Sequence, residues 1–269
     1  MGESQVFGDV GVELGDGFVA TAEIRRPPHN YFDLALIDDL ASAFEALDDE
    51  PGCRAVLLCS EGKNFCAGAQ LGGGSRSQVE APVDPARSEE PARHLYDAAV
   101  RLFSTKTPVV AAIQGAAIGG GLGVALMPDF RIAAPEARFA ANFARLGFHH
   151  GFGLSVTLPD LVGRQRAMEL LYTGRRIRAD EALSIGLCDR IAPLSELRDA
   201  ARELAREIGL SAPLAVRSIR ETLRRDLPER IRLATEREKS EQERLQQTVD
   251  FREGVRAMGE RRTPDFRGS

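Results

Sequence analysis

A glycine-dense turn at residues 115–123 could present backbone N–H groups to a negatively charged atom. It follows an apolar run at residues 109–113, which predicts a strand buried on both faces. Residues 122–127 then have a helix-forming composition. A strand that ends in glycines at a helix start leaves N–H groups unpaired, which suits a phosphate or the oxyanion of a reacting carbonyl. The same glycines would also allow close packing of helix on strand, so the turn alone does not distinguish an anion-binding role from a packing role.

A second small-residue turn, residues 62–71, follows another apolar run at residues 55–59. Two such turns, each placed after a strand, can offer one N–H group apiece to a single oxygen atom. The pair of turns therefore favours an oxyanion site over a packing role.

Residues 65–71, followed by residues 113–121, resemble two ordered motifs of the crotonase (enoyl-CoA hydratase/isomerase) superfamily, and the resemblance runs over nearly the whole chain. It implies that the N–H groups of Ala69 and Gly120 form the oxyanion hole for an acyl-CoA thioester carbonyl. Coenzyme A would then be part of the substrate, with no separate cofactor. Ala67, Gln70 and Leu71 of the first motif are implied substrate-binding positions, and Gln70 stands where the family usually has aspartate.

Two positions depart from the family pattern. Typical hydratases of the family use two glutamates to add water across an enoyl-CoA double bond. The first position is held here by Gly123 and the second by Phe143, neither of which can move a proton. The departure weighs against two-glutamate hydration and against isomerisation through the second glutamate. Decarboxylation, dehalogenation, C–C bond hydrolysis and thioester hydrolysis, which the family also performs on a stabilised oxyanion, stay open.

Histidines are the candidate acid/base groups, because imidazole titrates near neutral pH and the chain has four. His149 and His150 lie in a loop that by similarity borders the acyl pocket, and we expect one of them to face it. They are equally interpretable as packing or surface residues. His94, on the predicted helix after residue 91, is a third candidate or else part of a solvated face. Asn142 could hydrogen-bond a substrate or water but cannot act as a base.

Residues 26–30 resemble the loop that lies beside adenine in the family, which makes Arg26, Pro28 and Asn30 candidate contacts of coenzyme A. The basic residue often found near the Pro28 position is absent. Arg26 and Lys63 are the candidate partners for the phosphates.

The elements that carry these motifs predict an α/β fold. Two strands with a glycine turn open the chain, and Asp33 is placed to cap a helix that leads to the next strand, so parallel pairing is expected. Residues 71–90 lack apolar periodicity and predict a mobile lid over the acyl pocket. After residue 194 the apolar residues recur with the period of a helix, and the first predicted helix there could be capped by Ser195.

We therefore divide the chain into a core, residues 1–194, and a helical C-terminal region, residues 195–269. The resemblance adds that the core is a crotonase-like spiral of ββα repeats. It also implies that the helical region mediates oligomerisation, as a homotrimer or a dimer of trimers.

Composition and motif spacing argue against several other classes of protein. The net charge of −5 gives no support for nucleic-acid binding, and no apolar run approaches membrane-spanning length. The four cysteines lack metal-type spacing and are expected to be reduced in a cytoplasmic protein, although Cys66, inside the first motif, is conceivable as a reactive thiol. The glycines miss the Gly-x-Gly-x-x-Gly spacing of a nicotinamide-dependent oxidoreductase.

The leading interpretation is an acyl-CoA-utilising enzyme of this family with an oxyanion hole and an atypical reaction. The alternative is a non-catalytic acyl-CoA-binding protein that has lost its acid/base residues.

Overall fold

The computed structural model describes residues 4–69 and 94–269. Within them lie a seven-stranded sheet, in the order β1-β2-β3-β4-β5-β7-β10, and a three-stranded sheet, β6-β8-β9. The strands are β1 Ser4–Phe7, β2 Val10–Leu14, β3 Val19–Ile24, β4 Ala55–Ser60, β5 Val109–Ile113, β6 Ala116–Ile118, β7 Phe130–Ala133, β8 Arg138–Ala140, β9 Ile177–Arg178 and β10 Arg190–Ile191. The helices are α1 Leu34–Asp48, α2 Leu95–Phe103, α3 Gly120–Leu126, α4 Leu154–Val162, α5 Arg164–Thr173, α6 Ala179–Ser184, α7 Leu197–Gly209, α8 Pro213–Arg224, α9 Leu227–Leu245 and α10 Val249–Gly259, with 3₁₀ turns η1 Asp16–Phe18 and η3 Asn142–Leu146.

A ββα unit recurs along the chain. Strand β5 enters the large sheet, β6 the small one, and α3 follows; β7, β8 and α4 repeat this order. Cys66 continues the pattern after β4, because it forms an isolated parallel bridge with Ala117 of β6. The predicted crotonase-like spiral of ββα repeats is confirmed.

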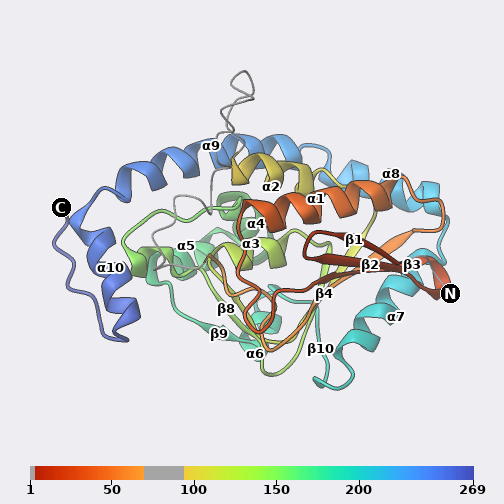
Figure 1. Cartoon of the computed structure of the whole chain (residues 1–269), viewed down its shortest axis with the longest axis horizontal. Coiled ribbons are helices and arrows are strands. Elements are labelled where there is room, and N and C mark those ends of the chain that lie inside the picture. Colours follow the sequence, from red (N-terminus) through yellow and green to blue (C-terminus); the bar gives the residue numbers. More distant parts are fainter. Residues whose placement is uncertain (1–3, 70–93) are drawn as a thin grey trace.

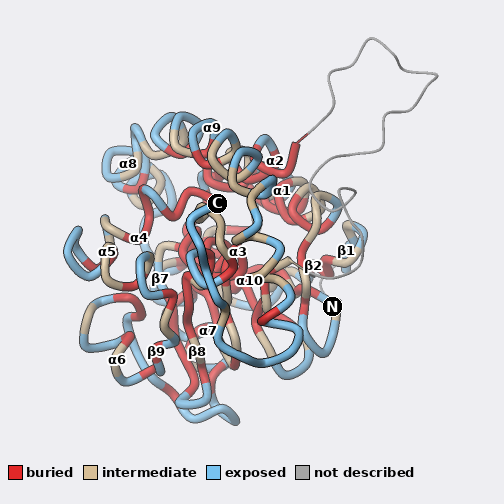
Figure 2. The backbone as a smooth tube through the Cα atoms, turned by 90° about the vertical axis from the view of Figure 1, so that its left-hand side faces the viewer, coloured by how far each residue is buried: buried red, intermediate tan, exposed pale blue. Residues whose placement is uncertain are grey.

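The large sheet is covered on both faces. From β3 to β7 the pairs are parallel, and alternate residues of each strand separate into two cores. One core packs against α1 and α2, and the other against α7. Buried stretches accordingly run through the strands at the centre of the molecule (Figure 2).

The C-terminal helices return over the core. Helix α9 lies along α2, and α10 packs against η3 at the far end (Figure 1). Helix α7 belongs to the packing of the large sheet although it begins beyond residue 194. The expected cap by Ser195 is wrong, because Glu196 occupies the cap position and its side chain makes no capping hydrogen bond. The expected lid, residues 71–90, lies outside the described residues.

Candidate active site

A cavity of about 640 Å³ opens where the β6–α3 turn, α2 and α9 meet. Its apolar lining includes Phe32, Leu95, Phe143, Leu146, Phe148, Phe152 and Met258. Its polar lining comprises Tyr31, Tyr96, Asn142, Gln242, Gln246, Arg138, Arg176 and Arg178. Ala67, Ala69 and Gly120 line the same cavity, so the structure brings both predicted motifs together.

The amides of Ala69 and Gly120 lie at this cavity without a hydrogen-bond acceptor among the described residues. Among the described residues, neither N–H group donates a hydrogen bond, whereas the adjacent Gly119 N–H donates to the Ala140 carbonyl at 2.8 Å. Gly68 precedes Ala69 with φ of 88°, and a Cβ there would lie 2.6 Å from the Ile118 carbonyl oxygen. Only glycine allows this approach, which brings the first turn against the end of β6.

Backbone pairing holds the two turns side by side. The Cys66 N–H donates to the Ala116 carbonyl at 2.9 Å, and the Ile118 N–H donates to the Cys66 carbonyl at 3.1 Å. The thiol of Cys66 is buried, which raises its pKa to about 12. A protonated, enclosed thiol is a poor nucleophile, so the role of Cys66 here is to pair the turns.

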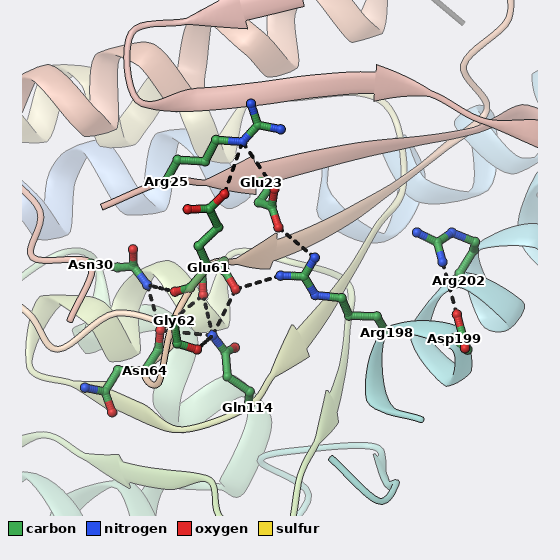
Figure 3. Close-up of polar contacts among 11 residues, drawn as sticks. Glu23, Arg25, Asn30, Glu61, Gly62, Asn64, Gln114, Arg198, Asp199 and Arg202 are labelled. Atoms are coloured by element: carbon green, nitrogen blue, oxygen red, sulfur yellow. Dashed lines mark hydrogen bonds and ion pairs between the residues drawn. The ribbon is translucent and has the colours of Figure 1, made fainter. Parts of the chain in front are cut away.

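A side-chain amide fastens the loop before the first motif (Figure 3). The Gln114 Nε2 group donates to the Ser60 carbonyl at 3.0 Å, to the Ser60 hydroxyl at 2.9 Å and to the Asn64 carbonyl at 3.0 Å. Gln114 directly follows β5, so it ties the loop to the strand that leads into the second motif.

The side-chain amides of Asn30 and Asn64 also hold this loop in place. The Asn30 Nδ2 group donates to the carbonyls of Glu61 and Asn64, both at 2.7 Å (Figure 3). The Asn64 side-chain oxygen accepts from the Ala116 N–H at 3.2 Å. Asn30, predicted to contact coenzyme A, therefore has a structural task as well, since its side chain is fully buried in this network.

The position of Gly123 leaves no space for a carboxylate. A Cβ on Gly123 would lie 2.7 Å from both Cβ and Cδ1 of Phe152. The Phe152 ring is 1% exposed and packs against Phe32 and Phe103, with ring centroids 5.7 and 6.2 Å away. An aromatic ring thus fills the volume that a side chain at position 123 would need.

Phe143 supplies a second aromatic wall. It is 7% exposed, meets Phe148 edge-on at 5.4 Å, and lies beside Gly119. Asn142 also reaches this point, because its side-chain oxygen would lie 3.3 Å from a Cβ on Gly119. The cavity lining within residues 4–69 and 94–269 contains no aspartate, glutamate or histidine.

None of the three candidate histidines is among the described residues that line the cavity. His94 is the N-cap of α2, where its Nδ1 accepts from the Tyr96 N–H at 3.1 Å. The ring of His149 stacks on that of His150, with centroids 4.1 Å apart. The Nε2 atom of His150 pairs with the Ser155 hydroxyl at 2.8 Å, and burial lowers the pKa of His150 to about 4.

Tyr96 is a cavity residue that the sequence analysis missed. Its hydroxyl donates to the Gln242 side-chain oxygen at 2.7 Å, and the Gln242 Nε2 group donates to the His149 carbonyl at 3.0 Å. Burial raises the pKa of Tyr96, and the nearby Glu238 carboxylate raises it further. Tyr96 therefore stays a neutral hydrogen-bonding group, whose partner comes from α9, far along the chain.

The predicted contacts of coenzyme A are scattered. Arg26 is held by the carboxylates of Asp9 and Asp33 and does not line the cavity. Pro28 lies outside the lining too, and its carbonyl accepts from the Asn64 N–H at 3.2 Å. Gln70 and Leu71 lie outside the described residues.

Metal and membrane sites find no support in the described residues. No group of three or more His, Cys, Asp or Glu side chains there could hold a metal ion. No helix of that part of the chain is long and apolar enough to cross a bilayer.

Comparison with known proteins identifies the family of the chain. Residues 16–269 match the family described as enoyl-CoA hydratase/isomerase. A carnitinyl-CoA dehydratase of Proteus mirabilis is 33% identical, over 94% of this chain and 96% of its own. An enoyl-CoA isomerase/hydratase of Mycosarcoma maydis is 33% identical, over 91% of this chain and 90% of its own. The crystal structure of an enoyl-CoA hydratase/isomerase from Pseudoalteromonas atlantica superposes with a TM-score of 0.81 at 28% identity, covering 96% of this chain and all of that one.

Proposed function

Because the chain belongs to the enoyl-CoA hydratase/isomerase family, we propose that it is an acyl-CoA-utilising enzyme whose cavity binds the thioester carbonyl between the N–H groups of Ala69 and Gly120. One observation carries the proposal: two backbone donors without a partner among the described residues line one cavity. Donors fixed in this way stabilise negative charge as it develops on the carbonyl oxygen. Substrates would be acyl-CoA thioesters, with coenzyme A as part of the substrate.

The proposed reaction differs from two-glutamate hydration. Position 123 has no space for a carboxylate beside Phe152, and Phe143 presents a ring at the other position. The amides can still stabilise a thioester enolate or a tetrahedral oxyanion. His94, His149 and His150 remain the candidates for proton transfer. Each is replaced singly by alanine and thioester turnover is measured; full activity in all three variants would refute a catalytic role for them.

The carbonyl contact can be tested without knowing the reaction. Two hydrogen bonds to the carbonyl contribute about 1–3 kcal/mol. Wild-type protein should therefore bind acetyl-CoA about tenfold more tightly than S-ethyl-CoA, a thioether of similar size that lacks the carbonyl. Titration calorimetry measures both affinities. Equal affinities for thioester and thioether would refute the oxyanion hole.

A variant sharpens the test. A Cβ on Gly120 would lie 2.2 Å from the Phe32 ring, so Gly120→Ala must displace the turn and should abolish the preference for the thioester. Gly259→Ala is the matched control, because a Cβ on Gly259 meets no atom within 4 Å. Circular dichroism checks that both variants fold.

The alternative is a non-catalytic acyl-CoA-binding protein, favoured by the lack of a carboxylate or imidazole in the described lining. Both proposals expect the thioester preference, and turnover separates them. Loss of conjugated absorbance from a short trans-2-enoyl-CoA reports hydration, and a wider panel of thioesters reports the other reactions. Binding with no turnover on the whole panel would select the alternative.

Assembly is a further part of the proposal. Helix α8 exposes Leu214, Ile219 and Leu223, by 82%, 59% and 78%. Ile219 and Leu223, four residues apart, lie on one face of the helix. Exposed apolar side chains gathered in this way mark a protein-contact surface, and we propose that this face of α8 joins copies of the chain into a homotrimer or a dimer of trimers. Leu223→Glu should lower the mass measured by light scattering, whereas Val6→Glu, at another exposed apolar residue, should leave it unchanged.

A further inference from the structure

Three arginines form one wall of the cavity. Arg138 lies on β8, Arg178 on β9, and Arg176 just before β9. Arg138 and Arg178 are directly opposite in the antiparallel pair, so their side chains leave the same face of the small sheet. The guanidinium groups of Arg138 and Arg178 therefore share one side of the cavity.

This arginine wall has no carboxylate partner among the described residues. Arg138 donates to the main-chain carbonyls of Glu136 and Ala137. The adjacent Arg175, by contrast, is bound by the carboxylates of Glu169 and Glu181, at 2.8 and 2.5 Å. Glu169 and Glu181, which lie on either side of β9 in the sequence, are thus already engaged by Arg175.

An unneutralised positive wall stands out in a chain whose net charge is −5. Like charges held on one face repel each other, and a bound anion would offset that repulsion. Guanidinium groups are also the side chains best suited to bidentate binding of phosphate or carboxylate oxygens. The ligand that fits this wall is an anion.

The wall lies within reach of the proposed thioester position. In the small sheet Ile118 of β6, two residues before Gly120, pairs with Ala140. Ala116, two residues earlier on the same strand, pairs with Arg138. Two residues along a strand span roughly 7 Å, and β9 lies about 5 Å further across the sheet. An anion on the wall would therefore belong to the same molecule whose carbonyl faces the amides.

We propose that Arg138, Arg176 and Arg178 bind an anionic group of the acyl-CoA substrate. This inference rests on the proposed function. It replaces the expected role of Arg26, whose guanidinium is taken up by Asp9 and Asp33. The anion has two sources, the phosphates of coenzyme A or a carboxylate at the end of the acyl chain, and both offer the same oxygen chemistry to the wall.

Calorimetric titration distinguishes the sources with four probes: acetyl-CoA, acetyl-pantetheine, succinyl-CoA and succinyl-pantetheine. The variants are Arg178→Ala and Arg138→Ala/Arg178→Ala, and the control is Arg164→Ala, an exposed arginine outside the cavity. Losing a charge-assisted hydrogen bond should weaken binding about tenfold. The control should bind every probe as the wild type does.

The pattern of loss identifies the anion. If the wall binds phosphate, the variants weaken both coenzyme A thioesters and leave both pantetheine thioesters unchanged. If it binds an acyl carboxylate, they weaken both succinyl thioesters and spare both acetyl ones. Wild-type affinity of the double variant for all four probes overturns the inference while the function stands. A wild-type protein without preference for thioester over thioether refutes the function itself.

Discussion

Replacing Gly123 with alanine adds one methyl group at the point where the family usually carries a carboxylate. That methyl group would lie 2.7 Å from two carbon atoms of Phe152, a contact that forces the ring or the helix to move. The structure therefore predicts that the cost of the substitution depends on the Phe152 ring. A double-mutant cycle between the two positions measures this dependence directly.

The expected change in the free energy of unfolding for Gly123→Ala combines two opposing effects. Overpacking a buried site costs about 1–3 kcal/mol, and alanine regains about 0.5–1 kcal/mol over glycine inside a helix such as α3. Gly123→Ala should therefore destabilise the wild type by roughly 1–2 kcal/mol. Phe152→Ala alone removes a buried ring and should cost about 3–5 kcal/mol. Once the ring is gone the methyl group has space, so Gly123→Ala should then be neutral or slightly stabilising.

Urea-induced unfolding of the four proteins, at one protein concentration, gives the free energies of unfolding. We expect a coupling of about 2 kcal/mol between the two substitutions. Gly259→Ala, in open space, serves as the control and should show no coupling to Phe152→Ala. An equal cost of Gly123→Ala in both backgrounds would refute the conclusion that Phe152 fills the place of the missing side chain.

Three other predictions use the same unfolding assay. Gln114→Ala removes three hydrogen bonds, to the Ser60 carbonyl, the Ser60 hydroxyl and the Asn64 carbonyl, and should destabilise the fold by about 2 kcal/mol. It should also reduce the preference for acetyl-CoA over its thioether; an unchanged preference would show that the network does not position the oxyanion hole. The Glu238 carboxylate accepts from the N–H groups of Gly153 and Ser155 at the start of α4, and burial raises its pKa. The free energy of unfolding should therefore fall as pH rises above 4.5, and Glu238→Gln should remove this pH dependence. Burial lowers the pKa of His150 to about 4, so its contribution to the free energy of unfolding is present above pH 6.5 and lost as pH falls toward 4. His150→Gln should remove this pH dependence. An NMR titration of His150 with a midpoint near 6.5 would contradict the lowered pKa.

Much of the fold was predictable because its signals are local. The apolar runs before both turns are the buried strands β4 and β5, and Asp33 caps α1 by accepting from the Leu36 N–H, as predicted. The cap expected at Ser195 was wrong although the residue type is favourable. Capping depends on backbone angles at the helix start, which residue type alone does not determine.

The sequence pattern predicts the short strands β7, β8 and β10, whereas β6 and β9 could not be predicted, because they depend on distant partners. Strand β6 consists of Ala116–Ile118, a run of small and apolar residues that follows Gly115 and carries no strand period of its own. It becomes a strand because Cys66 pairs on one side and β8 on the other. Strand β9, with two residues, depends in the same way on β8. Pairing between distant segments is absent from any local pattern.

The candidate site shows the same difference between residues with local sequence signals and residues that meet only through distant packing. The sequence could bring the motif residues Ala69 and Gly120 together, because the role proposed for them needs only backbone donors and the glycines beside them. Tyr96 and Gln242 were missed, since their meeting depends on how α9 docks over α2. The role of His94 as a helix cap was missed as well, because histidine is an uncommon cap and its partner is the adjacent backbone.

The use of backbone donors also explains how the family signature can persist while the glutamates are gone. The N–H groups are positioned by strand pairing at Cys66, by the left-handed glycine at 68 and by the amide network around Gln114. None of these contacts involves position 123 or Phe143. Side chains at those two positions can therefore differ without moving the two amides that we propose bind the carbonyl. In this chain those positions hold a glycine packed under Phe152 and an aromatic wall, so the proposed reaction needs proton-transfer groups from elsewhere.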